Sequence, residues 1–412
     1  MLRDLCSVCE GEQNEFVGMQ FIDGSPAVSF PRGYRLSEND DDVRKDILRL
    51  LATIQKFSDK RDGYSNESKG KDTVSFPLLS YQHIIRDFLA NGYYIEREDL
   101  YKEASKGKIN WKRTIQQKKP QIDNGNVVYL DFIVKSSRIN QNTLLAKIHE
   151  YCVYESFRNI GWLFVSGNMM PRKPQLRLNK KLFISTVKEA LSNTFNSAKK
   201  ILFTSMINVL ENADESVSEK VTAKFGTYNF EYVWERMIDF VFGEENKEIY
   251  FPHARWHIIR SNDKDVESSA LLPDTVMLFE DKIYVLDAKY YKYGITGYPN
   301  HLPNSSSIQK QITYGEYINM KFRFEPNDIY NAFVMPYGKE NDEDDNYRFV
   351  SVGTADWKEY NKNTLNYNYV LGILLDVKHL VTTYSKQNIS EIETISNLIG
   401  DSLKEYRKRH GE

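Results

Sequence analysis

The stretch LLPDTVMLFEDKIYVLDAKYY, residues 271–291, constrains the fold more than any other part of the 412-residue chain. Two apolar runs, 272–279 and 283–288, lie on either side of the charged residues Glu280, Asp281 and Lys282. Apolar runs of this length around a short polar turn are typical of a β-hairpin. The sequence therefore predicts two paired strands here, and later apolar runs predict strands that extend their sheet: 329–335, 347–352 and 369–375.

The hairpin also carries charged residues where strand side chains converge. Asp287 and Lys289 are two residues apart, so they project from the same face of the second strand, and Asp274 lies on the first. Two carboxylates aimed at one point repel each other unless a cation lies between them, and oxygen ligands suit Mg²⁺ or Mn²⁺. A lysine there can orient the attacking water or stabilise charge developing on a phosphate. We therefore expect a metal-assisted site with Asp274, Asp287 and Lys289 as catalytic residues, although solvated charges on an edge hairpin give the same short motif.

Pro273-Asp274, followed after twelve residues by Asp287-Ala288-Lys289, resembles the motif of the PD-(D/E)XK nuclease superfamily. Three further segments occur in an order that resembles the LlaJI-type restriction endonucleases, relatives of the McrC subunit of McrBC systems. They are GKINWKRT at 107–114, NFEYVWE at 229–235 and KQITY at 310–314. The resemblance is strongest over residues 225–320.

This resemblance implies a fold class and a set of metal ligands. The implied fold is α/β: a PD-(D/E)XK restriction-endonuclease-like core with a mixed sheet flanked by helices, plus an N-terminal α+β domain. The implied ligands of Mg²⁺, for which Mn²⁺ can substitute, are Asp274, Asp287, the backbone carbonyl of Ala288 and Glu231 on the preceding helix, with Glu235 as the alternative. Many relatives also carry a Q-x-x-x-Y signature in the next helix. Here Lys310 lies four residues before Tyr314, and Gln311 is one place late.

Composition bounds the remaining possibilities. The length allows two or three domains, and a hydrophobic content of 41% allows buried cores. The chain lacks a run of eighteen apolar residues and an apolar N-terminal signal, so we expect a soluble cytoplasmic protein with no membrane partner. Cys6 and Cys9 lack a second pair or nearby histidines and fall short of a zinc site. A net charge of −2 favours a chain that gains DNA affinity from a partner.

Basic residues cluster in the first half at 107–119, GKINWKRTIQQKK, around Trp111. We expect strands at 93–95, 108–115 and 127–134, preceded by helices at 41–57 and 76–91. These elements predict an α+β module, or alternatively a winged helix that contacts DNA directly. In the McrC-like comparison the N-terminal domain enters the ring of a partner AAA+ GTPase. Lys112 and Arg113 are therefore candidates for partner contacts, and a DNA-backbone role fits the same charges.

Helical patterns dominate the second half. Apolar residues at helical spacing predict helices at 142–165, 181–213, 225–242, 305–322 and 390–410. The expected organisation is an N-terminal α+β domain over 1–140, which docks a partner or contacts DNA, and a helical scaffold with the nuclease domain over 141–412. The chain has no G-x-x-x-x-G-K-[ST] motif, so we do not expect it to hydrolyse a nucleoside triphosphate itself.

The favoured function is the metal-dependent endonuclease subunit of a McrBC-like restriction system. Such a subunit cleaves phosphodiester bonds of double-stranded DNA under the control of a separate McrB-like AAA+ GTPase hexamer. The alternative is a self-sufficient type II-like endonuclease or repair nuclease whose N-terminal domain reads DNA directly. A binding module with a degenerate nuclease fold is disfavoured because Asp274, Asp287 and Lys289 are all present.

Overall fold

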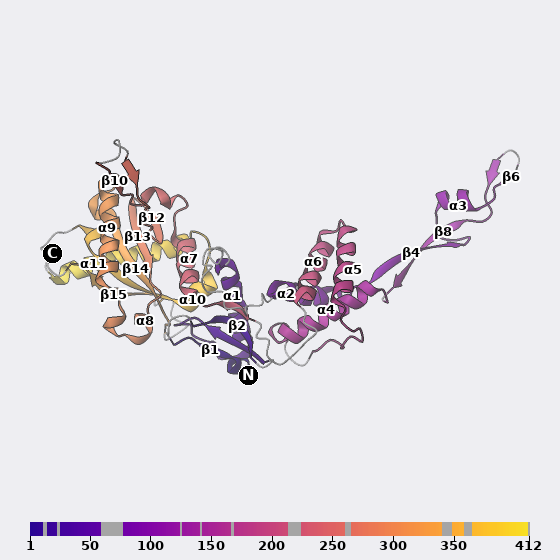
Figure 1. The fold of residues 1–412 in the computed structure, drawn as a ribbon, viewed down its shortest axis with the longest axis horizontal. Helices are drawn as coiled ribbons and strands as arrows, with labels where there is room; N and C mark the ends of the chain where they lie inside the picture. Colours follow the sequence, from indigo (N-terminus) through magenta and orange to yellow (C-terminus); the bar gives the residue numbers. More distant parts are fainter. Residues whose placement is uncertain are drawn as a thin grey trace. The chain divides into compact units, whose positions relative to one another are not determined.

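The computed structural model describes residues 1–10, 15–22, 25–58, 77–123, 126–140, 142–165, 169–212, 224–259, 265–339, 348–357 and 365–410. The chain forms two compact units, which Figure 1 draws. The discontinuous unit comprises Met1–Thr73 and Thr222–Glu412, and the inserted unit comprises Val74–Val221.

The central sheet of the discontinuous unit has the strand order β12-β13-β14-β16-β15. β13, β14 and β16 run parallel, whereas β12 and β15 pair antiparallel at the two edges. The expected hairpin and the three later strands are confirmed, apart from residue 347, which lies outside the described residues. The strands are β12 (Thr275–Phe279), β13 (Lys282–Ala288), β14 (Ile329–Tyr337), β15 (Phe349–Ala355) and β16 (Val370–Asp376).

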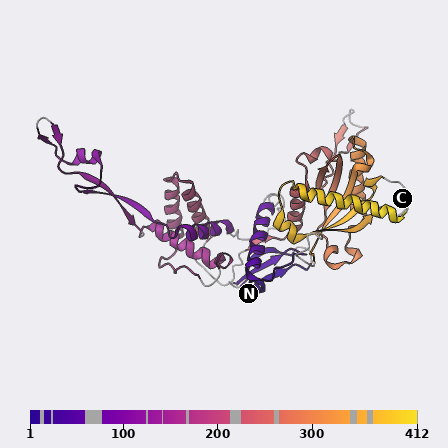
Figure 2. The same ribbon diagram turned by 180° about the vertical axis from the view of Figure 1, so that it is seen from behind.

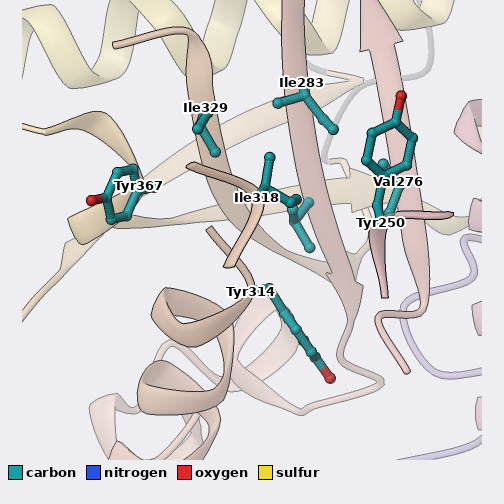
Figure 3. Close-up of a cluster of buried hydrophobic side chains, with 8 residues drawn as sticks. Tyr250, Val276, Ile283, Tyr314, Ile318, Ile329 and Tyr367 are labelled. Atoms are coloured by element: carbon teal, nitrogen blue, oxygen red, sulfur yellow. The ribbon is translucent and has the colours of Figure 1, made fainter. Parts of the chain in front are cut away.

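Helices cover both faces of this sheet because side chains alternate along each strand. Ile283 and Val285 of β13 share a buried cluster with Tyr314 and Ile318 of α9 (Ser305–Lys321), which Figure 3 shows. Tyr284 lies between them in sequence and faces α11 (Ile389–His410) instead. α7 (Phe230–Phe242) packs against β12 and β13, and α10 (Val377–Thr383) packs against β16. The expected mixed α/β class is thereby confirmed.

A second sheet joins the start of the chain to a strand from much later in the sequence. Its order is β1-β3-β2-β9, with β1 (Cys6–Val8), β2 (Val17–Ile22), β3 (Ser25–Phe30) and β9 (Lys224–Thr227). α1 (Asp40–Ser58) packs against β9 and α7. These pairings join the start of the chain to residues after 222 in one unit. The boundaries between the two units therefore differ from the domain boundary expected at residue 140.

Helices form the base of the inserted unit. α2 (Leu78–Asn91) packs against α4 (Leu144–Ile160) and α6 (Ser197–Asn212), and α5 (Lys180–Ser192) packs against α4 and α6. Because α2 and α4 share one helical layer, residue 140 lies inside this unit. No helix in the described ranges is long and apolar enough to cross a membrane.

A β-ribbon extends from these helices within the same unit (Figure 1, Figure 2). β4 (Glu96–Glu103) pairs antiparallel with β8 (Ile133–Asn140). Between them the chain forms β5 (Lys108–Ile109), α3 (Trp111–Gln117) and a hairpin of β6 (Gln121–Asp123) with β7 (Asn126–Val128). Residues 96–140 are called the arm below.

The expected continuous helix over 181–213 is wrong. α5 ends at Ser192, and α6 begins at Ser197 after a turn in which the Asn196 side chain accepts a hydrogen bond from the backbone N–H of Lys199 (3.0 Å). Asparagine favours such caps because its short side chain competes for backbone groups. The turn folds the two helices back on each other and leaves Phe195 93% exposed. Residue 213 lies outside the described residues.

The strand expected at 93–95 is also wrong, since β4 begins at Glu96. The strand expected at 108–115 begins at Lys108 as predicted, but it ends at Ile109 as β5. The Asn110 side chain then caps α3 by accepting from the backbone N–H of Arg113 (3.0 Å). Buried Thr114 accepts from the N–H of Ile133 (3.0 Å), which docks α3 on β8. The helix expected over 225–242 begins only at Phe230, because the residues before it pair with β2.

Candidate active site

The end of β13 brings an aspartate and a lysine together. Nζ of Lys289 lies 2.7 Å from Oδ2 of Asp287, so the two side chains share a face as the two-residue spacing predicts. The backbone N–H of Lys289 donates to the carbonyl of Val334 on β14 (2.9 Å), which holds the lysine at the sheet. The Asp287 side chain is only 6% exposed, so this ion pair lies in a poorly hydrated place.

Asp274 reaches the same point from the start of β12. Its Oδ2 accepts a hydrogen bond from the backbone N–H of Ala288 (3.0 Å), which fixes the carboxyl beside β13. The pKa of Asp274 is raised to about 8, first by burial and then by the negative charges of Asp287 and Glu235 and a hydrogen bond with Asp287. The structure therefore places Asp274, Asp287 and Lys289 in one cluster.

Two glutamates on α7 face this cluster. Glu231 and Glu235 are four residues apart, so both lie on one side of the helix, and both line the same pocket. Of these two glutamates, it is Glu235 whose negative charge helps to raise the pKa of Asp274. The geometry thus favours Glu235, the alternative in the sequence, over Glu231 as the helix carboxylate nearest the two aspartates.

A pocket of about 680 Å³ opens at this end of the sheet. Besides the two glutamates it is lined by Ala288, Lys289 and residues of the segment 290–304. Arg32 also lines it, 258 positions before Tyr290 in the sequence. Sequence reasoning missed Arg32, because a lone arginine in a turn carries no periodic signal that connects it to the hairpin.

The helix α9 presents Gln311 to the sheet, and not Lys310. Gln311 is buried, and its Nε2 donates to the carbonyls of Val285 (2.7 Å) and Ala332 (3.4 Å), which belong to β13 and β14. Tyr314 is fully buried nearby, and its pKa is raised by burial and then by the charges of Asp287 and Asp274. The residue of this helix that contacts the sheet is therefore Gln311, which lies one place later than the glutamine of the Q-x-x-x-Y signature.

The oxygen donors at this point fit a hard divalent cation. Among the described residues, no three His, Cys, Asp or Glu side chains already stand in a metal-binding arrangement. Asp274 and Asp287 are nevertheless held together, and a bound cation would displace the proton that the raised pKa keeps on Asp274. Two aspartates and a glutamate are a set of oxygen donors that suits Mg²⁺ or Mn²⁺.

Asp274→Asn is expected to stabilise the metal-free chain, relative to wild type, more and more as the pH rises from 5 to 8. The folded state holds a proton on Asp274 up to about pH 8, whereas an unfolded aspartate loses it near its ordinary pKa of 3.8. The folded state thus binds more protons between these values, and its stability falls as pH rises through them. The amide mimics the protonated acid and removes this dependence. The free energy of unfolding is measured in urea with EDTA. We expect the difference between the variant and wild type to grow by at least ~1 kcal/mol in favour of the variant from pH 5 to pH 8. An equal difference at both pH values would contradict the raised pKa of Asp274.

The other sequence candidates, Lys112 and Arg113, belong to α3 in the arm of the inserted unit. Both are exposed, and the guanidinium of Arg113 lies 3.9 Å from the centroid of the Tyr101 ring. Around them the arm also exposes large apolar side chains, namely Trp111, Ile115, Ile122, Val127 and Leu130.

Comparison with known proteins adds three findings. The family model described as LlaJI restriction endonuclease matches residues 16–358. The chain is 24% identical over 256 residues to the type II restriction enzyme BsuMI component YdjA of Bacillus subtilis (strain 168), and it covers 55% of that relative and 60% of itself. It therefore spans about half the length of this curated relative. The third finding is a solved structure, the refined half-complex from the tetradecameric assembly of Thermococcus gammatolerans McrB AAA+ hexamers with bound McrC. The alignment with one of its chains covers 93% of this chain and 83% of the other, at 16% identity and a TM-score of 0.38.

Proposed function

Because the chain belongs to the LlaJI restriction endonuclease family, we propose that it is a metal-dependent endonuclease subunit that cleaves phosphodiester bonds of double-stranded DNA. The observation that carries this proposal is the cluster of Asp274, Asp287 and Lys289 at the end of β13. The mixed sheet between α7 and α9 supports a PD-(D/E)XK-type core around that cluster.

Mg²⁺ is the proposed cofactor, with Mn²⁺ as a substitute. Asp274, Asp287 and the backbone carbonyl of Ala288 would hold it, with Glu235 as the preferred helix carboxylate and Glu231 as the other candidate. When bound, such an ion polarises a phosphate oxygen and lowers the pKa of a bound water.

Lys289 acts as a fixed cation in this proposal. Burial alone lowers the pKa of Lys289, but the contacts with Asp287 outweigh burial, and the net pKa is raised. The side chain therefore stays protonated at physiological pH and does not serve as a general base. Its ammonium is held 2.7 Å from Asp287 beside the pocket, where it can stabilise negative charge that develops on a phosphate.

The arm is the proposed docking site for a separate AAA+ GTPase hexamer of the McrB kind. Exposed apolar side chains such as Trp111 and Ile122 favour a protein partner, since a surface that binds only DNA phosphates needs charge and not apolar area. Lys112 and Arg113 add positive charge to the same surface. The relative from Bacillus subtilis is called a component of a restriction enzyme, which supports a chain that works with others.

Nuclease assays of the full chain test the proposal. The chain is incubated with plasmid DNA, alone and with a McrB-like AAA+ protein, in Mg²⁺ or EDTA. Cleavage that needs Mg²⁺ is the expected result. Equal cleavage in EDTA, or no cleavage by any combination of the folded proteins, contradicts the proposal.

Charge reversal in the arm should weaken partner docking without affecting the metal site. We expect Lys112→Glu combined with Arg113→Glu to reduce affinity for the AAA+ partner about tenfold, because two favourable interface charges become repulsive. Co-purification and a binding titration measure the loss, and Mn²⁺ titration checks the metal site.

Lys188→Glu is the matched control, because this lysine lies on α5 outside the arm, beside Glu211. A double variant that keeps its partner but loses DNA affinity would instead support the self-sufficient endonuclease, in which this region contacts DNA directly.

A further inference from the structure

A turn after β3 carries Arg32 to the end of the central sheet. Gly33 has φ +77, in the left-handed region that favours glycine. A Cβ at Gly33 would lie 3.0 Å from the carbonyl carbon of Tyr337, the last residue of β14. A Cβ at the next residue, Gly338, would lie 2.5 Å from the carbonyl oxygen of Gly33. The backbone of the turn therefore packs directly against the backbone that follows β14.

Tyr290, the residue after Lys289, fixes the arginine side chain. The backbone N–H of Arg32 donates to the Tyr290 hydroxyl (3.0 Å), and Nη1 of Arg32 donates to the Tyr290 carbonyl (3.2 Å). The guanidinium carbon also lies 4.4 Å from the centroid of the Tyr290 ring. Tyr290 itself packs against Phe230 and Trp234 of α7. These contacts give the guanidinium one position, at the wall of the pocket that Lys289 also lines.

Arg32 is a buried cation, with 8% of its surface exposed. An arginine stays charged in proteins, so Arg32 brings a permanent positive charge to the wall of the pocket. Its planar guanidinium matches the oxygens of a phosphate, which it can contact through more than one N–H. Together with Lys289 and Lys292, Arg32 places positive charge in a pocket that Glu231 and Glu235 would otherwise make negative.

We propose that Arg32 binds a backbone phosphate of the DNA substrate in this pocket and so positions the strand against Asp287 and Lys289. This inference rests on the nuclease function proposed above and adds a substrate-binding residue to it. It also changes the expected division of labour. Residues 1–140 were expected to dock a partner or contact DNA while residues 141–412 held the chemistry, whereas the pocket is completed by a residue from the first forty.

Binding of a short DNA duplex to the full chain across a salt series tests this role. The measurement is made in Ca²⁺ in place of Mg²⁺, so that binding is separated from cleavage. Arg32→Met keeps most of the apolar stem but removes the charge. We expect its Kd to rise at least ~10-fold, and the slope of log Kd against log salt to fall by about 0.9, the value for one lost phosphate contact.

Arg35→Met is the matched control. Arg35 belongs to the same turn segment, but its Nη1 donates to the carbonyl of Lys339 (2.8 Å), and it does not line the pocket. We expect the affinity and the salt slope of this variant to stay those of wild type. Arg32→Lys should keep the slope but lose part of the affinity, because a lysine retains the charge without the planar fork. This second variant keeps the test usable if Arg32→Met does not fold.

The alternative is that Arg32 only supports Tyr290. In that case Arg32→Met lowers the melting temperature and the Mn²⁺ affinity but leaves the salt slope unchanged, and the inference is overturned. An equal slope change in Arg35→Met overturns it too, as does a wild-type chain that binds neither the duplex nor thymidine 3′,5′-bisphosphate. A wild-type chain that shows the Arg32-dependent slope but never cuts DNA instead counts against the nuclease function alone.

Discussion

Asp287→Ala is expected to abolish Mg²⁺-dependent DNA cleavage while the chain stays folded. The substitution removes the carboxylate that contacts Lys289 and hydrogen-bonds Asp274, so it takes away a proposed metal ligand and the anchor of the lysine together. Loss of a residue that merely orients a metal ligand typically costs 10–100-fold, so loss of the ligand itself should cost more than ~100-fold. Rates of plasmid cleavage with the AAA+ partner present measure the effect.

The fold of the variant is checked by its melting temperature. Removing Asp287 leaves the Lys289 ammonium without its ion pair, so the metal-free variant should melt lower than wild type while it stays folded at the assay temperature. Asp281→Ala is the matched control, since Asp281 is exposed in the turn of the same hairpin and should leave cleavage unchanged. A folded Asp287→Ala chain that cuts DNA at the wild-type rate would show that the active site lies elsewhere.

Lys289→Ala is expected to lower cleavage by about 10²–10³-fold, the usual cost of losing a group that stabilises developing charge. The ammonium cannot ligate a cation, so the affinity for Mn²⁺ should change little. The raised pKa keeps this lysine charged through the neutral range, so deprotonation of Lys289 should not shape the pH profile of the wild-type rate below its ordinary pKa of 10.5.

The useful comparison for this variant is between rate and metal affinity. Lys282→Ala, at the other end of β13, removes a lysine that lies beside Glu280 at the turn, and it should change neither quantity. If metal affinity in Lys289→Ala falls in proportion to the rate, the lysine supports the metal ligands and does not act on the phosphate.

The sequence by itself determined the local geometry of the candidate site. The two-residue spacing of Asp287 and Lys289 fixes their common face, because the strand period of two is a property of the extended backbone. Apolar runs predicted the hairpin and the strands of the central sheet for the same reason. Helical spacing likewise located α1, α2, α9 and α11 within a few residues, since each buries one continuous apolar face.

Only the tertiary structure decided which distant residues join that site. Glu231 and Glu235 share a helix face, and the choice between them depends on how α7 packs against β12 and β13. In the same way, the rotation of α9 on the sheet presents Gln311 to β13 in place of Lys310. Arg32 reaches the pocket because β9 pairs with β2 and the Gly33 turn meets the end of β14. Such contacts arise from the packing of the whole core, whereas sequence periodicity reports only each segment's own backbone geometry.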